Sequence, residues 1–128
     1  MVQTRSAESH FAEMNDIWKS FLHQRVNSFV KWDLVRFFHD NPHTADTAEH
    51  IARSIGRDLR NIEQELSGLA EAGILDMRRM SGLSIYRLST EEETRKLIKQ
   101  FVAACYNRNF REQAIHVIHS MSVVQAGA

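Results

Sequence analysis

The chain has 128 residues, one cysteine and a formal net charge of zero from 16 basic and 16 acidic residues. This length suits one domain with helical extensions, and the balanced charge excludes binding to nucleic acid or anionic membrane by bulk electrostatic attraction. With Cys105 as its single thiol, the chain forms no intrachain disulfide, which suits a reducing compartment. We expect no signal sequence, since the chain does not open with a charged-then-apolar pattern, and no apolar run reaches the about 20 residues that span a bilayer. We therefore expect a cytoplasmic protein without a membrane partner.

Two helices are predicted in the first third of the chain. From Ser9, apolar residues recur at spacings of three and four, which is typical of an amphipathic helix. Asn27 and Ser28 are candidate N-caps of a second helix, and Asp40-Asn41-Pro42 ends it because proline disfavours a helical residue before it. The first stripe comprises Phe11, Met14, Ile17, Trp18, Phe21, Leu22 and Val26, and the second Phe29, Trp32, Leu34, Val35 and Phe38.

A short strand and a helix are predicted next. Thr44-Ala45 forms the strand, and Asp46 with Glu49 fits a capping box, in which two side chains satisfy each other's free backbone donors. Gly56 ends the helix because glycine tolerates a positive φ. The residues of this helix that we expect to face inward are Ala48, Ile51, Ala52 and Ile55.

A second helix and a hairpin follow. The helix runs from about Asp58 to Ala72, and Gly73 ends it. Its inward positions, three and four residues apart, are Leu59, Ile62, Leu66, Leu69 and Ala70. A strand to about Met80, a Ser81-Gly82 turn and a return strand over 84–88 form the hairpin. Strand alternation places Tyr86 and Leu88 on the core and Leu83, Ile85 and Arg87 on the other face.

The last predicted helix has Glu91-Glu92-Glu93 in its first turn, where negative charge suits the positive helix end. The sequence Asn107-Arg108-Asn109 bends or breaks this helix. The apolar stripe on either side of that point comprises Leu97, Ile98, Phe101, Val102, Cys105, Phe110, Ala114, Val117, Ile118 and Met121.

The polar face of the helix over 58–72 carries residue types that suit base recognition. Arginine bonds guanine with two hydrogen bonds, Asn and Gln do the same to adenine, and glycine permits close backbone approach. The hairpin arginines are positioned to touch phosphate or the minor groove, and the preceding helix adds one more arginine. The candidate DNA-binding residues are Arg53, Arg57, Arg60, Asn61, Gln64, Gly68, Arg78, Arg79 and Arg87. The alternative is a solvated amphipathic helix with ordinary surface arginines.

The ordered pieces Ile51-Ala52, Ile55-Gly56, Leu69 to Leu75 and Tyr86-Arg87-Leu88 carry a family resemblance. The segment 29–88 resembles the winged helix-turn-helix domain of small bacterial and archaeal transcription regulators, the broad MarR, ArsR and PadR-like group. The resemblance implies a mainly α fold with a small antiparallel hairpin wing and additional N- and C-terminal helices. It also implies a homodimer with the helix over 58–72 in the major groove and the wing, about 75–88, on the backbone or minor groove. Metal-sensing ArsR-type members carry a paired-cysteine motif where this chain has Arg60-Asn61-Ile62-Glu63, so thiolate metal sensing is not implied.

Three parts are expected: an N-terminal helical extension over 1–28, the winged helix-turn-helix domain over 29–89, and a C-terminal helix or helices over 90–128. The domain over 29–89 cannot by itself bury the aromatic residues of the flanking stripes. We therefore expect both flanking parts to form a two-fold dimer interface. The alternative is that the terminal helices pack on each other within one chain. The aromatic residues concerned are Phe11, Trp18, Phe21, Phe101 and Phe110.

Neither catalysis nor a metal site has a sequence signature. His116 and His119 share a helical face, and His39 and His43 flank a turn, but no cysteine pair or carboxylate cluster accompanies either pair. We therefore expect no enzyme activity, no metal and no cofactor. Cys105 lies on an apolar face, which favours a buried structural thiol over a redox sensor. A small-molecule effector has room between the DNA-binding part and the terminal helices, although no residue identifies it.

The leading interpretation is a sequence-specific DNA-binding transcription regulator that acts on double-stranded DNA as a homodimer. The main alternative is a winged-helix module that recognises a protein and not DNA, which the net neutrality and the acidic Glu63, Glu65 and Glu71 favour. A metal- or redox-responsive sensor is a third alternative. Convergence of the arginines on one surface would indicate DNA, and an apolar patch there would indicate a protein partner.

Overall fold

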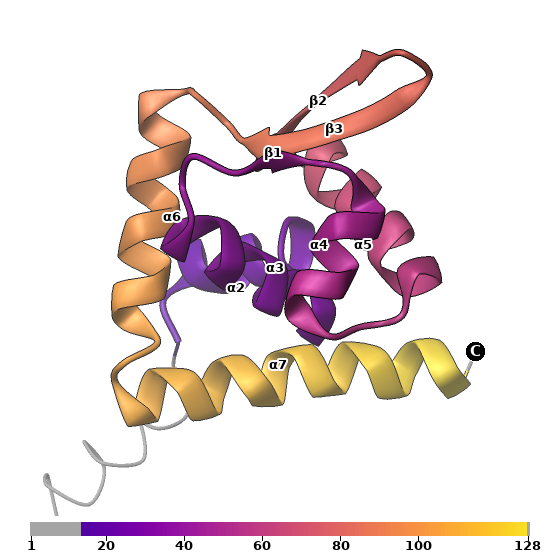
Figure 1. Cartoon of the computed structure of the whole chain (residues 1–128). Coiled ribbons are helices and arrows are strands. Elements are labelled where there is room, and N and C mark those ends of the chain that lie inside the picture. Colours follow the sequence, from indigo (N-terminus) through magenta and orange to yellow (C-terminus); the bar gives the residue numbers. More distant parts are fainter. Residues whose placement is uncertain (1–13, 128) are drawn as a thin grey trace, which may run out of the picture.

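The computed structural model describes residues 14–127, which are mainly helical with a small three-stranded antiparallel sheet (Figure 1). The helices are α2 (Asp16–Gln24), α3 (Phe29–Asp40), α4 (Ala48–Ile55), α5 (Leu59–Glu71), α6 (Glu92–Ala104) and α7 (Arg108–Gly127), and the strands are β1 (Ala45–Asp46), β2 (Leu75–Met80) and β3 (Leu83–Leu88). The mainly helical fold with one small antiparallel sheet is thus confirmed. Within the described range, none of the helices is both long enough and apolar enough to cross a membrane. The predicted start of the first helix, at Ser9, lies outside the described residues.

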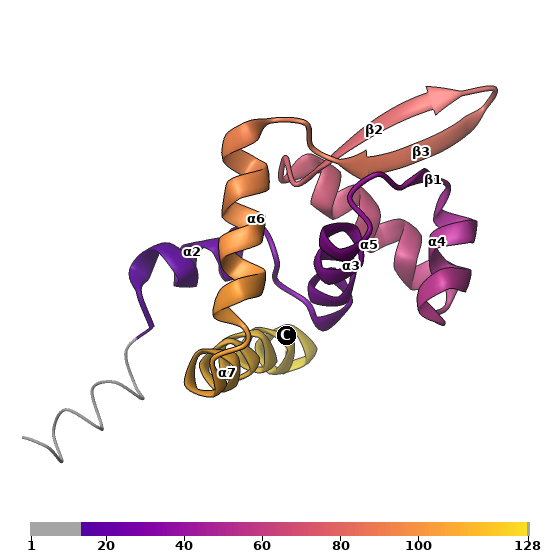
Figure 2. The ribbon, with the colours of Figure 1, turned by 60° about the vertical axis from the view of Figure 1, so that its left-hand side comes forward.

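The sheet has the strand order β1-β3-β2. The hairpin register runs from Leu75 opposite Leu88 to Met80 opposite Leu83. The two turn residues, Ser81 and Gly82, have φ values of 53° and 81°, and a positive φ at both central positions is what a tight hairpin turn of type I′ requires. The hairpin projects beyond the helices on the side of α4 and α5 and away from α6 (Figures 1 and 2).

Local capping chemistry sets most of the helix ends. The Ser28 hydroxyl accepts a hydrogen bond from the Lys31 amide at 3.0 Å and starts α3 as predicted. Helix α4 ends at Gly56, whose φ of 70° lies in the left-handed region, also as predicted. Asn107 separates α6 from α7, because its side-chain oxygen accepts from the Phe110 amide at 3.0 Å.

The predicted capping box of Asp46 with Glu49 is wrong. Asp46 belongs to β1 and pairs with Tyr86, so α4 begins one residue later with Thr47 as its N-cap. The Thr47 hydroxyl accepts from the His50 amide at 3.3 Å, and Asp46 accepts from the Thr47 amide at 2.8 Å. Glu49 points along α4 to Arg53 instead of back to the cap.

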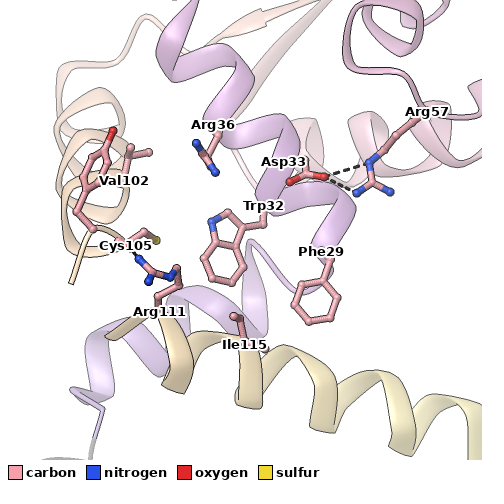
Figure 3. A pocket seen from close by; sticks show the side chains of 10 residues that line it. Phe29, Trp32, Asp33, Arg36, Arg57, Val102, Cys105, Arg111 and Ile115 are labelled. Carbon is pink, nitrogen blue, oxygen red and sulfur yellow. Dashed lines mark hydrogen bonds and ion pairs between the residues drawn. The ribbon is translucent and has the colours of Figure 1, made fainter. Parts of the chain in front are cut away.

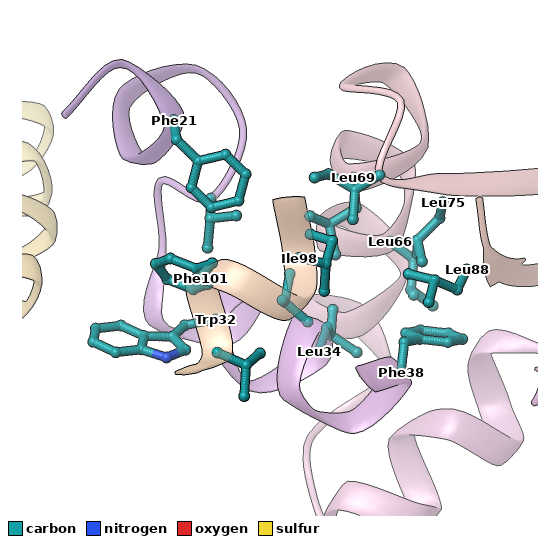
Figure 4. Packing of buried hydrophobic residues seen from close by; sticks show 14 of the residues in the cluster. Phe21, Trp32, Leu34, Phe38, Leu66, Leu69, Leu75, Leu88, Ile98 and Phe101 are labelled. Atoms are coloured by element: carbon teal, nitrogen blue, oxygen red, sulfur yellow. The ribbon is translucent and has the colours of Figure 1, made fainter. Parts of the chain in front are cut away.

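One hydrophobic core joins all three expected parts of the chain (Figure 4). Ile62, Leu66 and Leu69 of α5 are fully buried against it, as the spacing predicts. Leu59 was expected inward but is 38% exposed, at the first position of α5, which starts with Asp58 as its N-cap. The core also receives Leu34 and Phe38 from α3, Leu75 and Leu88 from the sheet, and Ile98 and Phe101 from α6.

The aromatic residues of the terminal helices form a cluster within the single chain. Phe101 lies at its centre, with ring centroids 4.9 Å from Phe21, 5.8 Å from Trp18, 5.9 Å from Trp32 and 6.1 Å from Phe110. Helix α2 also packs directly on α7. The alternative interpretation, in which the terminal helices pack on each other, therefore accounts for these aromatic residues without a dimer. Phe11 lies outside the described residues.

Candidate nucleic-acid interface

The outer face of α5 presents an amide and guanidinium row. Arg60, Asn61 and Gln64 are exposed, opposite the buried Ile62 and Leu66. Within residues 14–127, none of the three makes a side-chain hydrogen bond or ion pair. The helix period thus brings these three candidate residues to one accessible surface, where their donors and acceptors are free for a ligand.

Gly68 does not belong to this surface. A Cβ at Gly68 would lie 2.8 Å from Cε and 2.9 Å from Nζ of Lys31, so the missing side chain makes room for α3. The Lys31 ammonium donates to the Asn27 amide oxygen at 2.7 Å and lies 3.8 Å from a Glu65 oxygen. The Ser28 hydroxyl donates to the other oxygen of Glu65. The close approach that glycine permits is therefore used by α3 and not left for a duplex.

Two further candidates are already paired. Arg57 lies in the turn between α4 and α5, where its guanidinium forms an ion pair with Asp33 of α3 and its Nε donates to the same carboxylate at 3.1 Å. Arg53 points outward from α4, and its Nη2 is 4.0 Å from Glu49. The second pair is largely exposed on both sides, so it contributes little and leaves Arg53 free to exchange partners.

The hairpin arginines do not converge on one face. Arg78 lies opposite Ile85 and Arg79 lies opposite Ser84. Because successive side chains of a strand point to opposite faces, Arg78 and Arg79 point away from each other. Arg87 shares the face of Arg78, and its Nε is 3.9 Å from an Asp76 oxygen. Convergence of all the arginines on one surface, the feature that would indicate DNA, is therefore incomplete, because Arg78 and Arg79 lie on opposite faces.

The hairpin also exposes apolar side chains, of which only Leu83 was predicted to face away from the core. Met77 is 47%, Met80 56% and Leu83 57% exposed. Met80 and Leu83 lie opposite each other next to the turn, so these two form a small apolar tip, whereas Met77 pairs with Tyr86 farther back on the other face. Alternation places Leu83 and Met80 on the face away from the core, whereas it places Met77 on the face of Tyr86. The local pattern does not show whether another element covers the tip.

The charge around α5 is mixed. Glu63 and Glu71 are exposed on α5, whereas Glu65 is engaged by Ser28 and Lys31 of α3. Acidic groups next to Arg60 weaken the attraction to phosphate. The surface therefore offers specific donors and acceptors in place of a broad positive field.

A second feature is an open cleft of about 540 Å³ between α3, the end of α6 and the start of α7 (Figure 3). Trp32 and Arg36 of α3 lie along it, Cys105 follows the end of α6, and Arg111 of α7 reaches toward Cys105. The Asp33–Arg57 ion pair closes one side, while Phe29, Val102, Tyr106 and Ile115 complete the lining. Room for an effector was expected here without a named residue, because the cleft exists only where three separate helices meet.

Burial in this cleft affects the single thiol. Burial raises the pKa of Cys105 from 9.0 to about 11, although the nearby guanidinium groups of Arg36 and Arg111 and a hydrogen bond with Trp32 each act to lower it. Cys105 is 9% exposed. The expected burial of Cys105 is confirmed, and its raised pKa favours the protonated, weakly nucleophilic thiol.

Histidine does not gather with other metal ligands in the described part of the chain. There, no three His, Cys, Asp or Glu side chains come together at a spacing that could hold a metal ion. His116 and His119 are exposed on α7, His43 is exposed, and His39 Nδ1 lies 3.2 Å from Asp40.

Comparison of the chain with protein-family models, with curated proteins and with solved structures found no match.

Proposed function

We propose that this protein is a winged helix-turn-helix transcription regulator that binds double-stranded DNA, with α5 as the recognition helix and the β2–β3 hairpin as the wing. The element order supports this proposal. Helix α3 is followed by the short strand β1, by α4 and α5, which are joined at the left-handed Gly56, and by the β2–β3 hairpin, whose strand β3 pairs with β1. The observation that carries it is the exposed row of Arg60, Asn61 and Gln64, which has no intramolecular partner within residues 14–127.

The proposed contacts follow from chemistry and reach. An α-helix fits the major groove of B-DNA, where Arg60 would recognise guanine and Asn61 and Gln64 would recognise adenine. One of the hairpin arginines, Arg78 or Arg79, would contact phosphate while the other points away, since they occupy opposite faces. Because carboxylates flank the row, we expect base contacts to contribute much of the affinity and salt to affect it less than for a strongly basic reader.

We further propose that the regulator acts as a homodimer on a palindromic site, as two-fold DNA readers of this kind do. The aromatic cluster is not available for the interface because it is buried within one chain. Among the described residues, Ile17 of α2 is 67% exposed and Tyr106, between α6 and α7, is 79% exposed. The proposed interface uses these two apolar side chains.

The test begins with selection of duplexes from a random library by the purified protein. Binding of the selected site and of a scrambled duplex is then measured across a salt series for wild type, Asn61→Ala and Arg79→Ala. A base contact typically supplies about 1–3 kcal/mol of discrimination, so Asn61→Ala should lower the preference for the selected site about 5- to 150-fold. Arg79→Ala, if its face meets phosphate, should weaken both duplexes equally and flatten the salt dependence.

Arg108→Ala is the matched control, because Arg108 is an exposed arginine of α7, paired with Glu112 and away from α5. It should bind both duplexes like wild type. Failure to retain any duplex at low salt would refute DNA binding. If the selected site is bound equally by wild type, Arg60→Ala, Asn61→Ala and Gln64→Ala, DNA binding stands and the proposed reading face is wrong.

A second candidate function is recognition of a protein partner, which the apolar hairpin tip favours. Met80 and Leu83 are 56% and 57% exposed, and a partner would bury them. A photo-crosslinking residue at position 80 tests this alternative in cells. A single crosslinked protein that disappears in Leu83→Ser, together with no retained duplex, would establish the alternative.

A further inference from the structure

The outer edge of β2 is not paired with any strand in the described part of the chain. Within residues 14–127 the sheet has the order β1-β3-β2, so β2 has a neighbour on one side only. Apart from the pairing with β3, the backbone of residues 76–80 makes no hydrogen bond within that range. Alternate residues of an antiparallel strand direct their amide and carbonyl groups away from the partner strand. The outward groups of β2, on a hairpin that projects beyond the helices, are therefore accessible (Figures 1 and 2).

An open groove of about 630 Å³ lies beside this edge. Met77 and Arg78 both line the groove although they point to opposite faces of β2, so the groove reaches the strand edge. Ala70 and Glu71, at the end of α5, and Ile85 of β3 line it as well. An extended chain therefore has room to lie along β2.

The middle of the edge carries two positive charges that have no partner among the described residues. Arg78 and Arg79 are exposed and form no ion pair or side-chain hydrogen bond within residues 14–127. They lie on opposite faces of β2, between the exposed Met77 and Met80. The edge therefore presents side chains in the order apolar, basic, basic, apolar.

The carboxylates that line the groove do not neutralise these charges. Asp76 is the second residue of β2, and one of its oxygens lies 3.9 Å from Nε of Arg87. Glu71 is the last residue of α5 and forms no ion pair with Arg78 or Arg79. The two free guanidinium groups thus favour a ligand with negative charge.

We propose that the edge of β2 binds an extended segment of a partner protein with the order apolar, acidic, acidic, apolar, which adds a fourth strand to the sheet. In strand addition, main-chain hydrogen bonds provide affinity and the side chains provide specificity. Side chains directly opposite each other share a face, so the two carboxylates face Arg78 and Arg79, and the two apolar side chains face Met77 and Met80. Because this order is the same in both directions, it fits parallel and antiparallel pairing.

The backbone groups favour a protein strand over nucleic acid at this edge. A phosphate backbone would attract the same two charges but would leave the outward amide and carbonyl groups and both methionines uncovered. The proposed site is the strand edge and not the tip of the hairpin, and it does not depend on DNA binding by α5.

The test uses the full chain labelled with ¹⁵N, nuclear magnetic resonance and three peptides with blocked ends. The peptide TVEEVT has the fitting order, TVKKVT reverses its charge, and EVTTVE has the same composition with the glutamates moved to the ends. We expect TVEEVT to bind with a Kd below about 1 mM and each of the other two peptides to bind at least tenfold more weakly.

Hydrogen exchange distinguishes strand addition from attraction between charges alone. An added strand accepts hydrogen bonds from the outward amides of β2, so saturating TVEEVT should slow the exchange of alternate amides in residues 75–80. The amides of α7 should exchange as they do in the free protein. Unchanged exchange along β2 in the saturated protein would show that the peptide is held by its charge and would overturn the proposal.

Charge-reversed variants locate the site. Arg78→Glu combined with Arg79→Glu should weaken TVEEVT at least tenfold and tighten TVKKVT by a similar factor. The matched control combines Lys96→Glu with Lys99→Glu, which changes the net charge equally at two exposed positions of α6 and should bind the peptides like wild type. Circular dichroism confirms that both variants are folded.

Three binding results would each refute the proposal. These are failure of TVEEVT to bind, equal binding of EVTTVE or TVKKVT by wild type, and identical behaviour of the two charge-reversed variants. None of the measurements uses DNA, so each result leaves the proposed reading face of α5 to its own test.

Discussion

Replacing Phe101 by alanine tests whether the aromatic cluster belongs to the core of one chain. Phe101 is fully buried, and four aromatic rings have centroids within 6.1 Å of its own, the closest being Phe21 at 4.9 Å. Truncating a buried phenylalanine costs about 3–5 kcal/mol, and aromatic pairs worth about 0.5–1.5 kcal/mol each favour the upper part of that range. A loss of this size is a large fraction of the stability of an ordinary domain.

The assay is urea denaturation followed by far-ultraviolet circular dichroism at two protein concentrations that differ about a hundredfold. Burial within one chain predicts the same loss of unfolding free energy at both concentrations, whereas burial between two chains makes stability depend on concentration. Phe29→Ala is the control: Phe29 is 38% exposed with one ring neighbour among the described residues, and its loss should cost about 1 kcal/mol. A cost for Phe101→Ala no greater than that of the control, or one that vanishes at low concentration, would refute this reasoning.

Three further predictions concern single sites. Gly68→Ala should change the free energy of unfolding little, because the gain of about 1 kcal/mol in helix propensity is offset by displacement of the Lys31 side chain. In a Lys31→Ala background, the same substitution should stabilise the protein by about 1 kcal/mol. Equal effects in both backgrounds, measured by chemical denaturation, would contradict the contact between position 68 and Lys31. Thr47→Ala should cost about 1 kcal/mol in the same assay, since the α4 cap is lost, and an unchanged denaturation midpoint would show that the cap contributes nothing. The raised pKa of Cys105, about 11 against an ordinary 9.0, predicts alkylation at pH 8 about 100-fold slower in the folded chain than in urea, as followed by mass spectrometry. It also predicts that stability falls as pH rises from 9 to 11, because the unfolded chain releases the thiol proton first; equal alkylation rates in both states would argue against the shift.

Helix ends were predictable where the determining atoms are close in sequence. Ser28 caps α3 through an amide three residues away, and Gly56 ends α4 through its own φ. The start of α4 was not predictable in this way, because Asp46 belongs to β1, where it pairs with Tyr86, and Thr47 is therefore the N-cap residue. A partner 40 positions away in sequence thus overrode a local pattern that suited Asp46.

The same distinction applies to the candidate site. Helical period alone placed Arg60, Asn61 and Gln64 outward, and the structure has them exposed. Gly68 has the same polar-side position, but a contact across 37 residues between Ser28 and Glu65 draws α3 over that end of α5. The cleft depends on the meeting of three helices, so its arginines could be recognised only after folding.

The strand order of the sheet has a consequence for association between chains. Within residues 14–127, β2 pairs only with β3, so its outer edge presents backbone donors and acceptors that no strand of this range occupies. Such an edge can add a strand from another molecule and seed aggregation, and charged side chains on the edge are the usual safeguard. Arg78 and Arg79 stand in the middle of β2, between the exposed Met77 and Met80, and lie on both faces of the strand. Because these charges lie on both sides of the strand, they oppose the addition of a second copy of the same strand along this edge.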